Sequence, residues 1–479
     1  MSAVLGRLSA LGVQPAMITS DSRQVVPGGV FLACPGERVD GRLFIAQAIN
    51  QGAAAVVWES EGYQWNAQWQ LPNLPVEGLR GQLGAIASEF YGHPSRQLWM
   101  IGITGTNGKT SCSHWLAAAL TRLGRKTAVV GTLGNGFPGQ LGETANTTPD
   151  PLLLQHMLAD YRAQGAAGVA MEVSSHGLEQ GRVAGVHFDV AVFTNLSRDH
   201  LDYHGDMVRY AQAKKRLFFW PGLRSVVLNA DDALGQELAE DLAHQQVQVL
   251  TYGLQAGVVR GHTLKLEGGG LSMRVTTPQG EAQLVAPVLG RFNAYNLLAV
   301  LAALLATGVG VDEAVAALSE TIAVPGRMQQ LGGNGRPLVV VDYAHTPDAL
   351  EKVLLTLREQ TRGRLLCVFG CGGNRDKGKR PLMGEVVSRL ADGAIVTSDN
   401  PRHEPPEQII GEIVAAMGAN YQVEPDRAAA IASAILQAGK DDVVLLAGKG
   451  HEPYQEIDGI RLPFSDVEVA QRILEEKQA

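Results

Sequence analysis

The chain has 479 residues, of which 45% are hydrophobic and 18% are charged, and a formal net charge of -8. This composition is typical of a globular protein and excludes a disordered chain. The chain is too long for a single hydrophobic core, so we expect roughly two to four domains. The negative charge argues against non-specific nucleic-acid binding, which needs a basic surface.

Export and membrane insertion are not indicated by the sequence. The first residues lack a basic start followed by a long apolar run, and the longest apolar stretch, residues 297–306, is too short to span a bilayer. The four cysteines are scattered along the chain, and their number alone cannot establish a disulfide framework. We therefore expect a protein of the reducing cytoplasm with no membrane insertion.

The order of apolar segments predicts the fold class. The first 97 residues have strand patterns at 29–33 and 54–58 and end in a turn-prone Gly-His-Pro-Ser segment. From residue 99 onward short apolar segments alternate with helical patterns, which is typical of a parallel α/β sheet. We predict an α/β protein with three domains, at residues 1–97, 98–327 and 328–479.

Two series of strands are expected after the first domain. The first series has a helix at 109–123 and strands at 99–104, 127–131, 168–173, 189–193 and 225–228. The second series has strands at 338–341, 365–369, 394–397 and 443–447. Nearly every polar cluster follows one of these strands. Since ligands bind outside the carboxyl ends of strands in open α/β sheets, we expect these clusters to face shared clefts.

A glycine-rich segment after the strand at 99–104 has the features of a phosphate loop. Residues 105–110 read Gly-Thr-Asn-Gly-Lys-Thr and lead directly into a helix. Backbone N–H groups and a helix N-terminus attract anions there, while Lys109 would reach the terminal phosphates and Thr110 would ligate Mg²⁺. The strict P-loop pattern requires Gly where Ile103 stands, so an ordinary glycine-rich turn is the alternative. The order of strand, loop, Lys-Thr and helix favours the phosphate loop.

This hexapeptide resembles the ATP loop of the Mur ligases and of their folylpolyglutamate synthase relatives. Further motifs follow in the order of that family over nearly the whole chain. The resemblance implies a small N-terminal α/β uridine-binding domain, a central P-loop-type domain with a mostly parallel sheet and flanking helices, and a C-terminal Rossmann-like domain that binds an amino acid. It implies ATP contacts at Gly105, Thr106, Asn107, Gly108, Lys109, Thr110, Ser111, Asn293, Asn296, Arg327 and Asp342. Helix capping is an alternative role for Asn293.

A magnesium site and a modified lysine also follow from the resemblance. Glu172 and His200 come after two strands that we expect to be neighbours, and they match the two magnesium-binding motifs of the family. Either residue alone would more often be a capping or structural group. Lys214 matches the lysine that CO₂ carbamylates in the family, which turns a cation into an anion that can help hold Mg²⁺. The residues alone indicate a solvated basic helix, and Lys215 is the adjacent alternative. Lys109, His200 and Lys214 are the expected catalytic residues.

The clearest clue to the amino-acid substrate is Asp-Asn-Pro-Arg at residues 399–402. It resembles the signature of the family members that add meso-diaminopimelate, whereas lysine-adding members lack the arginine. Diaminopimelate carries a second carboxylate that lysine does not have, and a guanidinium can grip it with two parallel hydrogen bonds. Each of these charges taken singly could be a solvated loop residue. The implied contacts are Arg375, Asp399, Asn400, Pro401, Arg402, Gly448 and Glu452.

Further matches concern a nucleotide-linked substrate, UDP-N-acetylmuramoyl-L-alanyl-D-glutamate. The implied contacts are Ser20 and Ser22 in the first domain and Asn146, Thr147, Thr148, Ser174, Gln180 and Arg182 in the second. Arg182 would clamp a carboxylate, while the hydroxyls and amides suit sugar and peptide groups. Residues 37–39 read Glu-Arg-Val and depart from the His-Gln common among diaminopimelate-adding relatives, which leaves the uridine contacts open.

The expected function is an ATP-dependent amide-bond ligase of peptidoglycan precursor synthesis. ATP would phosphorylate the free carboxylate of the dipeptide, and the amine of meso-diaminopimelate would attack the acyl phosphate. ATP and Mg²⁺ are the expected cofactors, and the family suggests a monomer. The alternatives are a lysine-adding ligase, a folylpolyglutamate synthase-like ligase and a non-catalytic nucleotide-binding protein. Intact Lys109, Glu172, His200 and Lys214 argue against the last of these.

Overall fold

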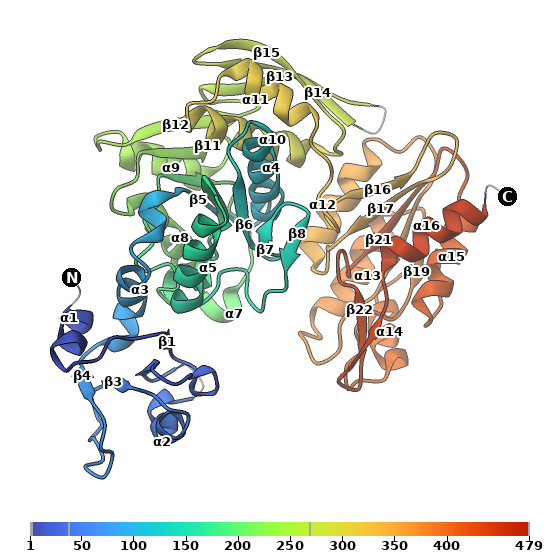
Figure 1. The fold of residues 1–479 in the computed structure, drawn as a ribbon. Coiled ribbons are helices and arrows are strands. Elements are labelled where there is room, and N and C mark those ends of the chain that lie inside the picture. Colours follow the sequence, from blue (N-terminus) through green and yellow to red (C-terminus); the bar gives the residue numbers. More distant parts are fainter. Residues whose placement is uncertain (1–2, 37–38, 268–269, 478–479) are drawn as a thin grey trace. The chain divides into compact units, whose positions relative to one another are not determined.

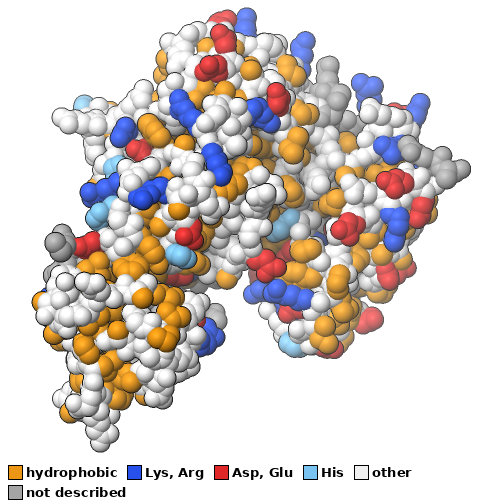
Figure 2. Space-filling model, in the orientation of Figure 1, with side chains coloured by type: hydrophobic (Ala, Val, Ile, Leu, Met, Phe, Trp, Pro, Cys, Tyr) orange, Lys and Arg blue, Asp and Glu red, His pale blue; other side chains and the backbone are white. Residues whose placement is uncertain are grey.

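The computed structural model describes residues 3–36, 39–267 and 270–477 (Figure 1). The chain divides into two compact units, which are residues 1–260 with 298–310 and residues 261–297 with 311–479. Among the described residues, we find no helix with the length and apolar character needed to cross a bilayer. On the face drawn in Figure 2, acidic and basic side chains are interspersed over the surface.

The first unit begins with a four-stranded parallel sheet. Its strands lie in chain order, β1 (Ile18–Thr19), β2 (Val30–Ala33), β3 (Ala55–Glu59) and β4 (Asn73–Val76). Its helices are α1 (Ala3–Ala10), α2 (Ile45–Asn50) and α3 (Leu79–Phe90). Alternation along β2 sends Val30 and Leu32 into the core with α1 and α3, and Phe31 and Ala33 into the core with α2. Parallel strands covered on both faces have this continuous apolar pattern, which is why both predicted strands are confirmed within one residue.

The larger sheet of the first unit places the phosphate loop. Its order is β12-β11-β10-β5-β9-β6-β7-β8. The parallel strands are β5 (Trp99–Thr104), β6 (Thr127–Gly131), β9 (Gly168–Glu172), β10 (Val190–Phe193), β11 (Ser225–Asn229) and β12 (Gln248–Gly253), while β7 (Gly134–Phe137) and β8 (Gln140–Gly142) are antiparallel. All predicted strands are confirmed within one residue. The expectation that the strands before Glu172 and His200 are neighbours is wrong, because β5 lies between β9 and β10.

Helices and an antiparallel segment complete this part of the chain. The helices are α4 (Lys109–Arg122), α5 (Pro151–Ala163), α6 (Ser175–Glu179), α7 (Leu201–His204), α8 (Met207–Lys215) and α9 (Ala233–Leu242). Strand β13 (Val259–Glu267) starts beside β12, with Val259 opposite Tyr252. In the second unit β14 (Gly270–Thr277) and β15 (Gly280–Ala286) form an antiparallel hairpin. Helix α10 (Arg291–Ala306) follows, with residues 291–297 in the second unit and 298–306 in the first, and α11 (Val311–Ser319) belongs to the second unit.

The second unit holds a six-stranded sheet in the order β16-β17-β21-β18-β19-β20. Its strands are β16 (Gln329–Gly332), β17 (Leu338–Asp342), β18 (Leu365–Phe369), β19 (Gly393–Val396), β20 (Tyr421–Val423) and β21 (Val443–Ala447), and only β16 is antiparallel to its neighbour. Helices α12 (Pro347–Arg358), α13 (Lys379–Leu390) and α14 (Pro406–Val414) pack on one face, and α15 (Arg427–Gln437) and α16 (Asp466–Glu476) on the other. The loops after β17, β18, β19 and β21 therefore share one edge.

A buried ion pair joins the two helices of the second face. Arg427 begins α15 and Asp466 begins α16, and their side chains are fully buried. The guanidinium donates to both carboxylate oxygens, at 2.7 and 2.6 Å, and also to the carbonyl oxygen of Ala447 at 3.0 Å. This contact holds the end of β21 at the point where the loop containing Gly448 begins.

Removing one partner of this pair should destabilise the second unit. Arg427→Met leaves the Asp466 carboxylate buried without its cation, which typically costs about 3–5 kcal/mol. We expect guanidinium chloride unfolding to show this loss in the transition of the second unit. The double variant Arg427→Met with Asp466→Leu should recover most of it, because the buried charge is then gone. A double variant as unstable as the single one would contradict this account.

Candidate active site

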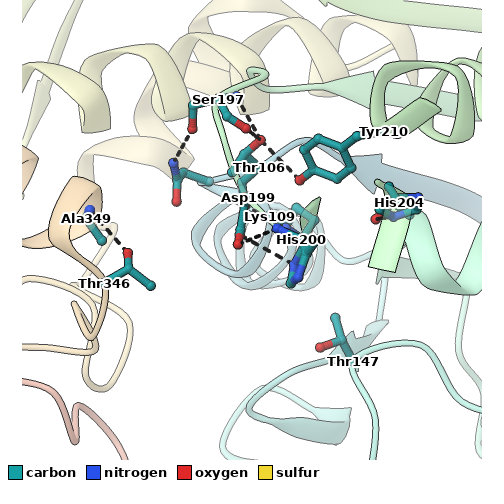
Figure 3. A network of polar contacts seen from close by, with 12 residues as sticks. Thr106, Lys109, Thr147, Ser197, Asp199, His200, His204, Tyr210, Thr346 and Ala349 are labelled. Atoms are coloured by element: carbon teal, nitrogen blue, oxygen red, sulfur yellow. Dashed lines mark hydrogen bonds and ion pairs between the residues drawn. The ribbon is translucent and has the colours of Figure 1, made fainter. Parts of the chain in front are cut away.

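The phosphate loop, residues 105–110, lies between β5 and α4, and its glycine positions are set by crowding. Gly105 has a φ of +146°, and a Cβ on it would lie 1.8 Å from the Thr194 hydroxyl oxygen. The Thr106 N–H donates to the Asn195 carbonyl at 2.8 Å, so the loop is fastened to the segment after β10. The Thr106 hydroxyl contacts Tyr210 OH at 3.2 Å (Figure 3). Only glycine fits at position 105 without moving that segment.

Two lysines converge on one carbonyl of this loop. Lys109 Nζ donates to the Gly105 carbonyl at 2.8 Å and to the Thr106 carbonyl at 2.9 Å. Lys214 Nζ donates to the same Gly105 carbonyl at 2.8 Å, and it lies 4.4 Å from the ring centre of Tyr210. Burial, with a further contribution from Lys109, holds the pKa of Lys214 well below its usual range. Lys214 therefore does not belong to a solvated helix face, which corrects the interpretation from the residues alone.

The adjacent Lys215 has the opposite surroundings. It contacts the carboxylates of Glu237 and Asp241, the latter at 3.1 Å. Partial burial opposes the charged form of Lys215, but these two contacts outweigh it and raise its pKa. Only Lys214 of the two is a buried amine beside the phosphate loop.

The carboxylate of Glu172 accepts several hydrogen bonds in the first unit. It ends β9 and is fully buried. One oxygen accepts hydrogen bonds from the Thr110 hydroxyl at 3.0 Å and the Thr132 hydroxyl at 3.1 Å, and the other accepts from the Thr132 N–H at 2.8 Å. A Cβ on Gly131 would lie 2.2 Å from this second oxygen. The carboxylate is thereby held against the hydroxyl that we expect to ligate Mg²⁺.

His200 lies on the other side of β5, in a group of aromatic side chains. Its φ is +54°, and its ring centre lies 4.9 Å from that of His176 and 6.0 Å from that of Tyr210. Its Nε2 lies 3.4 Å from a carboxylate oxygen of Asp199, with which it is drawn in Figure 3. His204, one turn further on, contacts the Ser175 hydroxyl at 2.9 Å. The loops after β9 and β10 therefore meet through ring contacts.

Sequence reasoning missed three of these aromatic residues, His176, His204 and Tyr210. The spacing of His200 and His204, four residues apart, was the available signal, because it places two imidazoles on one face of a helix. Nothing in the sequence indicated that a third histidine, from the loop after β9, would join them.

The predicted residues for the carboxylate substrate gather around Glu172. The Thr147 hydroxyl lies 3.0 Å from that of Thr132, and the Thr148 hydroxyl donates to the Glu172 carbonyl at 3.0 Å and lies 3.1 Å from that of Ser174. Arg182 donates to Gln180 Oε1 at 2.7 Å and to the Thr148 carbonyl at 3.0 Å. Asn146 is exposed in the preceding loop.

The uridine-site candidates lie elsewhere in the first unit, after β1 of the four-stranded sheet. Ser20 is exposed, and the buried Ser22 donates to Gln47 Oε1 at 3.0 Å. Glu37 and Arg38 lie outside the described residues, so the departure noted there has no structural description.

In the second unit, Asp342 is buried at the end of β17. Its oxygens accept the N–H groups of Met328 and Ala344, both at 2.8 Å. Burial raises the pKa of Asp342, while the Arg327 cation and these two N–H groups act against that rise. The Arg327 guanidinium lies 4.9 Å from the ring centre of Tyr343.

The asparagines at the start of α10 are held by each other. Asn293 Nδ2 donates to the Leu289 carbonyl at 2.8 Å, and Asn296 Nδ2 donates to Asn293 Oδ1 at 3.0 Å. Because α10 begins at Arg291, Asn293 lies inside the helix. The capping alternative for Asn293 is therefore wrong.

The residues predicted to bind the amino acid in the second unit include Asp399, Asn400, Arg402, Gly448 and Glu452, which lie in the loops after β19 and β21. Asn400 Nδ2 donates to Glu452 Oε2 at 2.8 Å. A Cβ on Gly448 would lie 2.6 Å from an Asp399 carboxylate oxygen, so these loops pack closely. Arg402 donates to the Gly373 carbonyl at 2.8 Å.

Two further predicted residues flank this site. Pro401 is buried, whereas Arg375 is exposed on the loop between β18 and α13. The prediction missed two charged residues here. Glu456, whose carboxylate lies 3.4 Å from Arg402 Nε, is on the hairpin of β22 (Tyr454–Ile457) and β23 (Ile460–Pro463), and Lys449 is fully buried.

Comparison with known proteins identifies the family. The catalytic domain of the Mur ligase family matches residues 15–91, the Mur ligase middle domain matches residues 103–304, and the Mur ligase glutamate ligase domain matches residues 326–450. The chain belongs to the Mur ligase family.

Relatives of this Mur ligase match over nearly its whole length. It is 55% identical to UDP-N-acetylmuramoyl-L-alanyl-D-glutamate--2,6-diaminopimelate ligase of Chromobacterium violaceum, over 98% of this chain and 96% of the relative. It is 54% identical to the protein of that name from Pseudomonas aeruginosa, over 95% of this chain and 94% of the relative. These relatives span all three predicted domains.

Solved structures confirm the predicted fold class. A structure of UDP-N-acetylmuramoyl-L-alanyl-D-glutamate--2,6-diaminopimelate ligase, 38% identical, matches with a TM-score of 0.73 over 97% of this chain and 96% of the other. A folylpolyglutamate synthase of Mycobacterium tuberculosis, 19% identical, matches with a TM-score of 0.63 over 77% of this chain and shares the fold alone. The Mur ligase fold, with its mostly parallel central sheet, is therefore shown.

The side chains beside the phosphate loop fit a magnesium ion. Mg²⁺ prefers oxygen ligands and usually takes one or two carboxylates together with substrate phosphates and waters. The Thr110 hydroxyl and the Glu172 carboxylate, 3.0 Å apart, offer such oxygens. Within the described ranges of this Mur ligase, no group of three or more His, Cys, Asp or Glu residues could hold a metal ion.

The position of Glu172 can be tested by adding one methyl group. Gly131→Ala introduces a Cβ that would lie 2.2 Å from a carboxylate oxygen of Glu172, so this side chain must shift from its present position. Displacing such a supporting carboxylate should lower the rate of ATP turnover about 10- to 100-fold and raise the Mg²⁺ concentration required. Gly81→Ala in α3 is the matched control, because its Cβ meets open space. An unchanged Mg²⁺ titration in Gly131→Ala would contradict the assignment.

Proposed function

We propose that this Mur ligase joins meso-diaminopimelate to UDP-N-acetylmuramoyl-L-alanyl-D-glutamate, with conversion of ATP to ADP and phosphate. As a family member it is an ATP-dependent ligase. The choice of amino acid rests on Arg402. This residue lies in the loop after β19, beside the buried Asp399 and Asn400. The names of the relatives support the same substrate pair.

ATP binding is assigned to the phosphate loop and Ser111, with Asn293, Asn296, Arg327 and Asp342 as candidates in the second unit. Lys109 would carry its charge to the terminal phosphates, at the N-terminus of α4 where anions are favoured. Thr110, Glu172, His200 and carbamylated Lys214 would hold Mg²⁺, which supplies positive charge to the phosphoryl oxygens. The present contacts of Lys109 with two loop carbonyls would then be exchanged for contacts with phosphate.

The nucleotide-linked substrate is assigned to the group around Glu172. Arg182 would hold a carboxylate of the dipeptide, with Gln180 keeping the guanidinium in place. Thr147, Thr148, Ser174 and Asn146 would bind its peptide and sugar groups, and Ser20 and Ser22 its uridine end. These residues orient the carboxylate, since positioning and electrostatics dominate phosphoryl transfer.

The chemistry needs no enzyme nucleophile. A carboxylate oxygen of the D-glutamyl group attacks the terminal phosphorus of ATP, and ADP leaves. The neutral amine of diaminopimelate then attacks the acyl carbon, forming a tetrahedral intermediate that expels phosphate and loses one proton. Lys109 would stabilise the negative charge that develops on the transferred group. We propose that the protein does this as a cytoplasmic monomer in peptidoglycan precursor synthesis.

Carbamylation of Lys214 is supported by its surroundings. CO₂ reacts with a neutral amine, giving a carbamate and a proton, and burial with the nearby Lys109 lowers the pKa of Lys214 toward that neutral form. The product is an anion beside Lys109 and the phosphate loop. The carbamate would attract the Lys109 cation, whereas a protonated Lys214 would repel it.

The modification predicts a spectroscopic signal that depends on one lysine. In ¹³C-bicarbonate buffer the wild type should show a carbamate carbon resonance by NMR, and Lys214→Gln should lose it. Lys215→Gln is the control and should keep it, because Lys215 is paired with carboxylates. The signal should weaken as the pH falls, since the protonated amine does not react. A resonance that persists in Lys214→Gln would refute the assignment.

The amino-acid substrate is tested by phosphate release with UDP-N-acetylmuramoyl-L-alanyl-D-glutamate and ATP. We expect release with meso-diaminopimelate and little with L-lysine. Arg402→Ala should lower kcat/KM for diaminopimelate by about a hundredfold or more, because the second carboxylate loses its guanidinium. Preference of the wild type for lysine, or unchanged kinetics in Arg402→Ala, would overturn the specificity argument.

A further inference from the structure

Lys449 is a fully buried lysine within the amino-acid site of the second unit. It follows Gly448 in the loop after β21, and its side chain has no exposed surface. A buried ammonium is costly unless several partners satisfy it. Its partners are all residues proposed above to bind the amino acid, although Lys449 itself was not among them.

The contacts of the ammonium are specific. Lys449 Nζ donates to Asn400 Oδ1 at 3.0 Å and to Glu452 Oε2 at 3.3 Å, and it lies 3.8 Å from an Asp399 carboxylate oxygen. The ring centre of Tyr454 lies 5.7 Å away. Because an ammonium can only donate hydrogen bonds, it holds the amide oxygen of Asn400, and not the amide nitrogen, toward itself.

The remaining contacts of Asn400 complete this orientation. Its Oδ1 also accepts the N–H of Glu456 at 2.9 Å, and its Nδ2 donates to Glu452 Oε2 at 2.8 Å. Two donors therefore hold the amide oxygen and a carboxylate holds the amide nitrogen. Together they fix the amide of Asn400 in one of its two possible orientations. Lys449 and Asn400 share the same Glu452 oxygen, so they also fix the plane of that carboxylate.

We propose that Lys449 is a positioning residue of the amino-acid site, an inference that rests on the proposed function. It acts through Asn400 and Glu452, which it orients so that Glu452 Oε1 receives the ammonium group of diaminopimelate. Asp399 and Glu452 carry two negative charges against the one positive charge of Lys449. The site thereby keeps one negative charge for the cationic end of the substrate, while Arg402 takes the distal carboxylate.

Two other buried cations of the same unit differ in what they hold. Arg380 contacts Glu404 and Glu412, and Arg427 contacts Asp466. None of these three carboxylates is a proposed substrate contact. Lys449 is distinguished from them because its ammonium bears directly on two proposed contacts.

The test separates positioning from general stability. Lys449→Met keeps the length of the side chain without its donors, and it should raise KM for meso-diaminopimelate about 10- to 100-fold, the cost of leaving buried polar partners unsatisfied. KM for ATP and for the nucleotide-linked substrate should stay within about twofold of wild type, well inside the energy of one hydrogen bond. Lys449→Arg, which keeps the charge, should recover part of the loss.

Lys477→Met is the matched control. Lys477 is an exposed lysine of the same unit that donates to the carbonyls of Ile435, Leu436 and Ala438 at the end of α15. This variant removes a lysine and its hydrogen bonds away from the amino-acid site, so its KM for diaminopimelate should equal that of wild type. Equal increases of all three KM values in Lys449→Met would overturn the proposal.

A double-mutant cycle asks whether Lys449 acts through Asn400. In an Asn400→Ala background, Lys449→Met should raise KM for diaminopimelate much less than it does alone, because residues in one network are not additive. Fully additive effects would refute positioning. If Lys449→Met does not fold, Lys449→Gln, which keeps a donor without the charge, carries the same cycle.

Failure of the proposed function gives a different result from failure of the positioning role of Lys449. A wild type that releases phosphate with another amino acid and not with diaminopimelate refutes the substrate assignment. The variant series is then run with that amino acid, and the positioning role stands or falls on whether its KM alone responds.

Discussion

The buried carboxylate of Glu172 is the constraint on which the catalytic half of this Mur ligase depends. It accepts hydrogen bonds from the phosphate-loop helix through Thr110 and from the segment after β6 through Thr132. Its own carbonyl accepts the hydroxyl of Thr148, in a loop proposed to bind the other substrate. Buried carboxylates are tolerated where several donors satisfy them, and here the donors to the carboxylate come from two separate segments, while a third segment binds the backbone carbonyl. Movement of this one side chain would therefore disturb the proposed metal, nucleotide and carboxylate sites together.

The two lysines beside the phosphate loop pose the complementary problem. Lys109 and Lys214 both donate to the Gly105 carbonyl, so their two amines lie close together and would repel each other if both were charged. The burial of Lys214 resolves this by favouring its neutral form, as its lowered pKa indicates. A neutral buried amine is also a nucleophile toward CO₂. The burial that favours the neutral amine is thus also what would make the proposed modification chemically accessible.

The sequence predicted the continuous apolar strands because their signal is local, whereas other strands such as β4, β12 and β14 were missed. Continuous apolar segments such as 99–104 and 443–447 are buried on both faces of parallel sheets, and their ends match β5 and β21. The hairpin of β22 and β23 was missed because it is short, half-buried or exposed, and not part of a buried sheet. Sheet order was not predictable either. The placement of β5 between β9 and β10 follows from long-range pairing, and it sets the phosphate loop between Glu172 and His200.

The candidate site also divides into features that the sequence predicted and features that it could not predict. Motifs predicted which residues would carry chemistry, and the structure brings Thr148, Ser174 and Arg182 together. Motifs could not indicate which charges are buried. Lys449 looks like an ordinary loop charge in the sequence, because its burial depends on how the loops after β19 and β21 pack.

That packing also explains why the second unit retains buried ions at all. A buried ion pair seldom adds stability over apolar side chains of the same volume, so its persistence requires another reason. In the proposed amino-acid site, we propose that the reason is the substrate. Lys449 partly neutralises Asp399 and Glu452, whose remaining negative charge would meet the ammonium group of the amino acid. Lysine and diaminopimelate share that ammonium and differ by one carboxylate, so discrimination between them would rest on Arg402. The Arg427–Asp466 pair holds the end of β21, which the loop containing Lys449 follows.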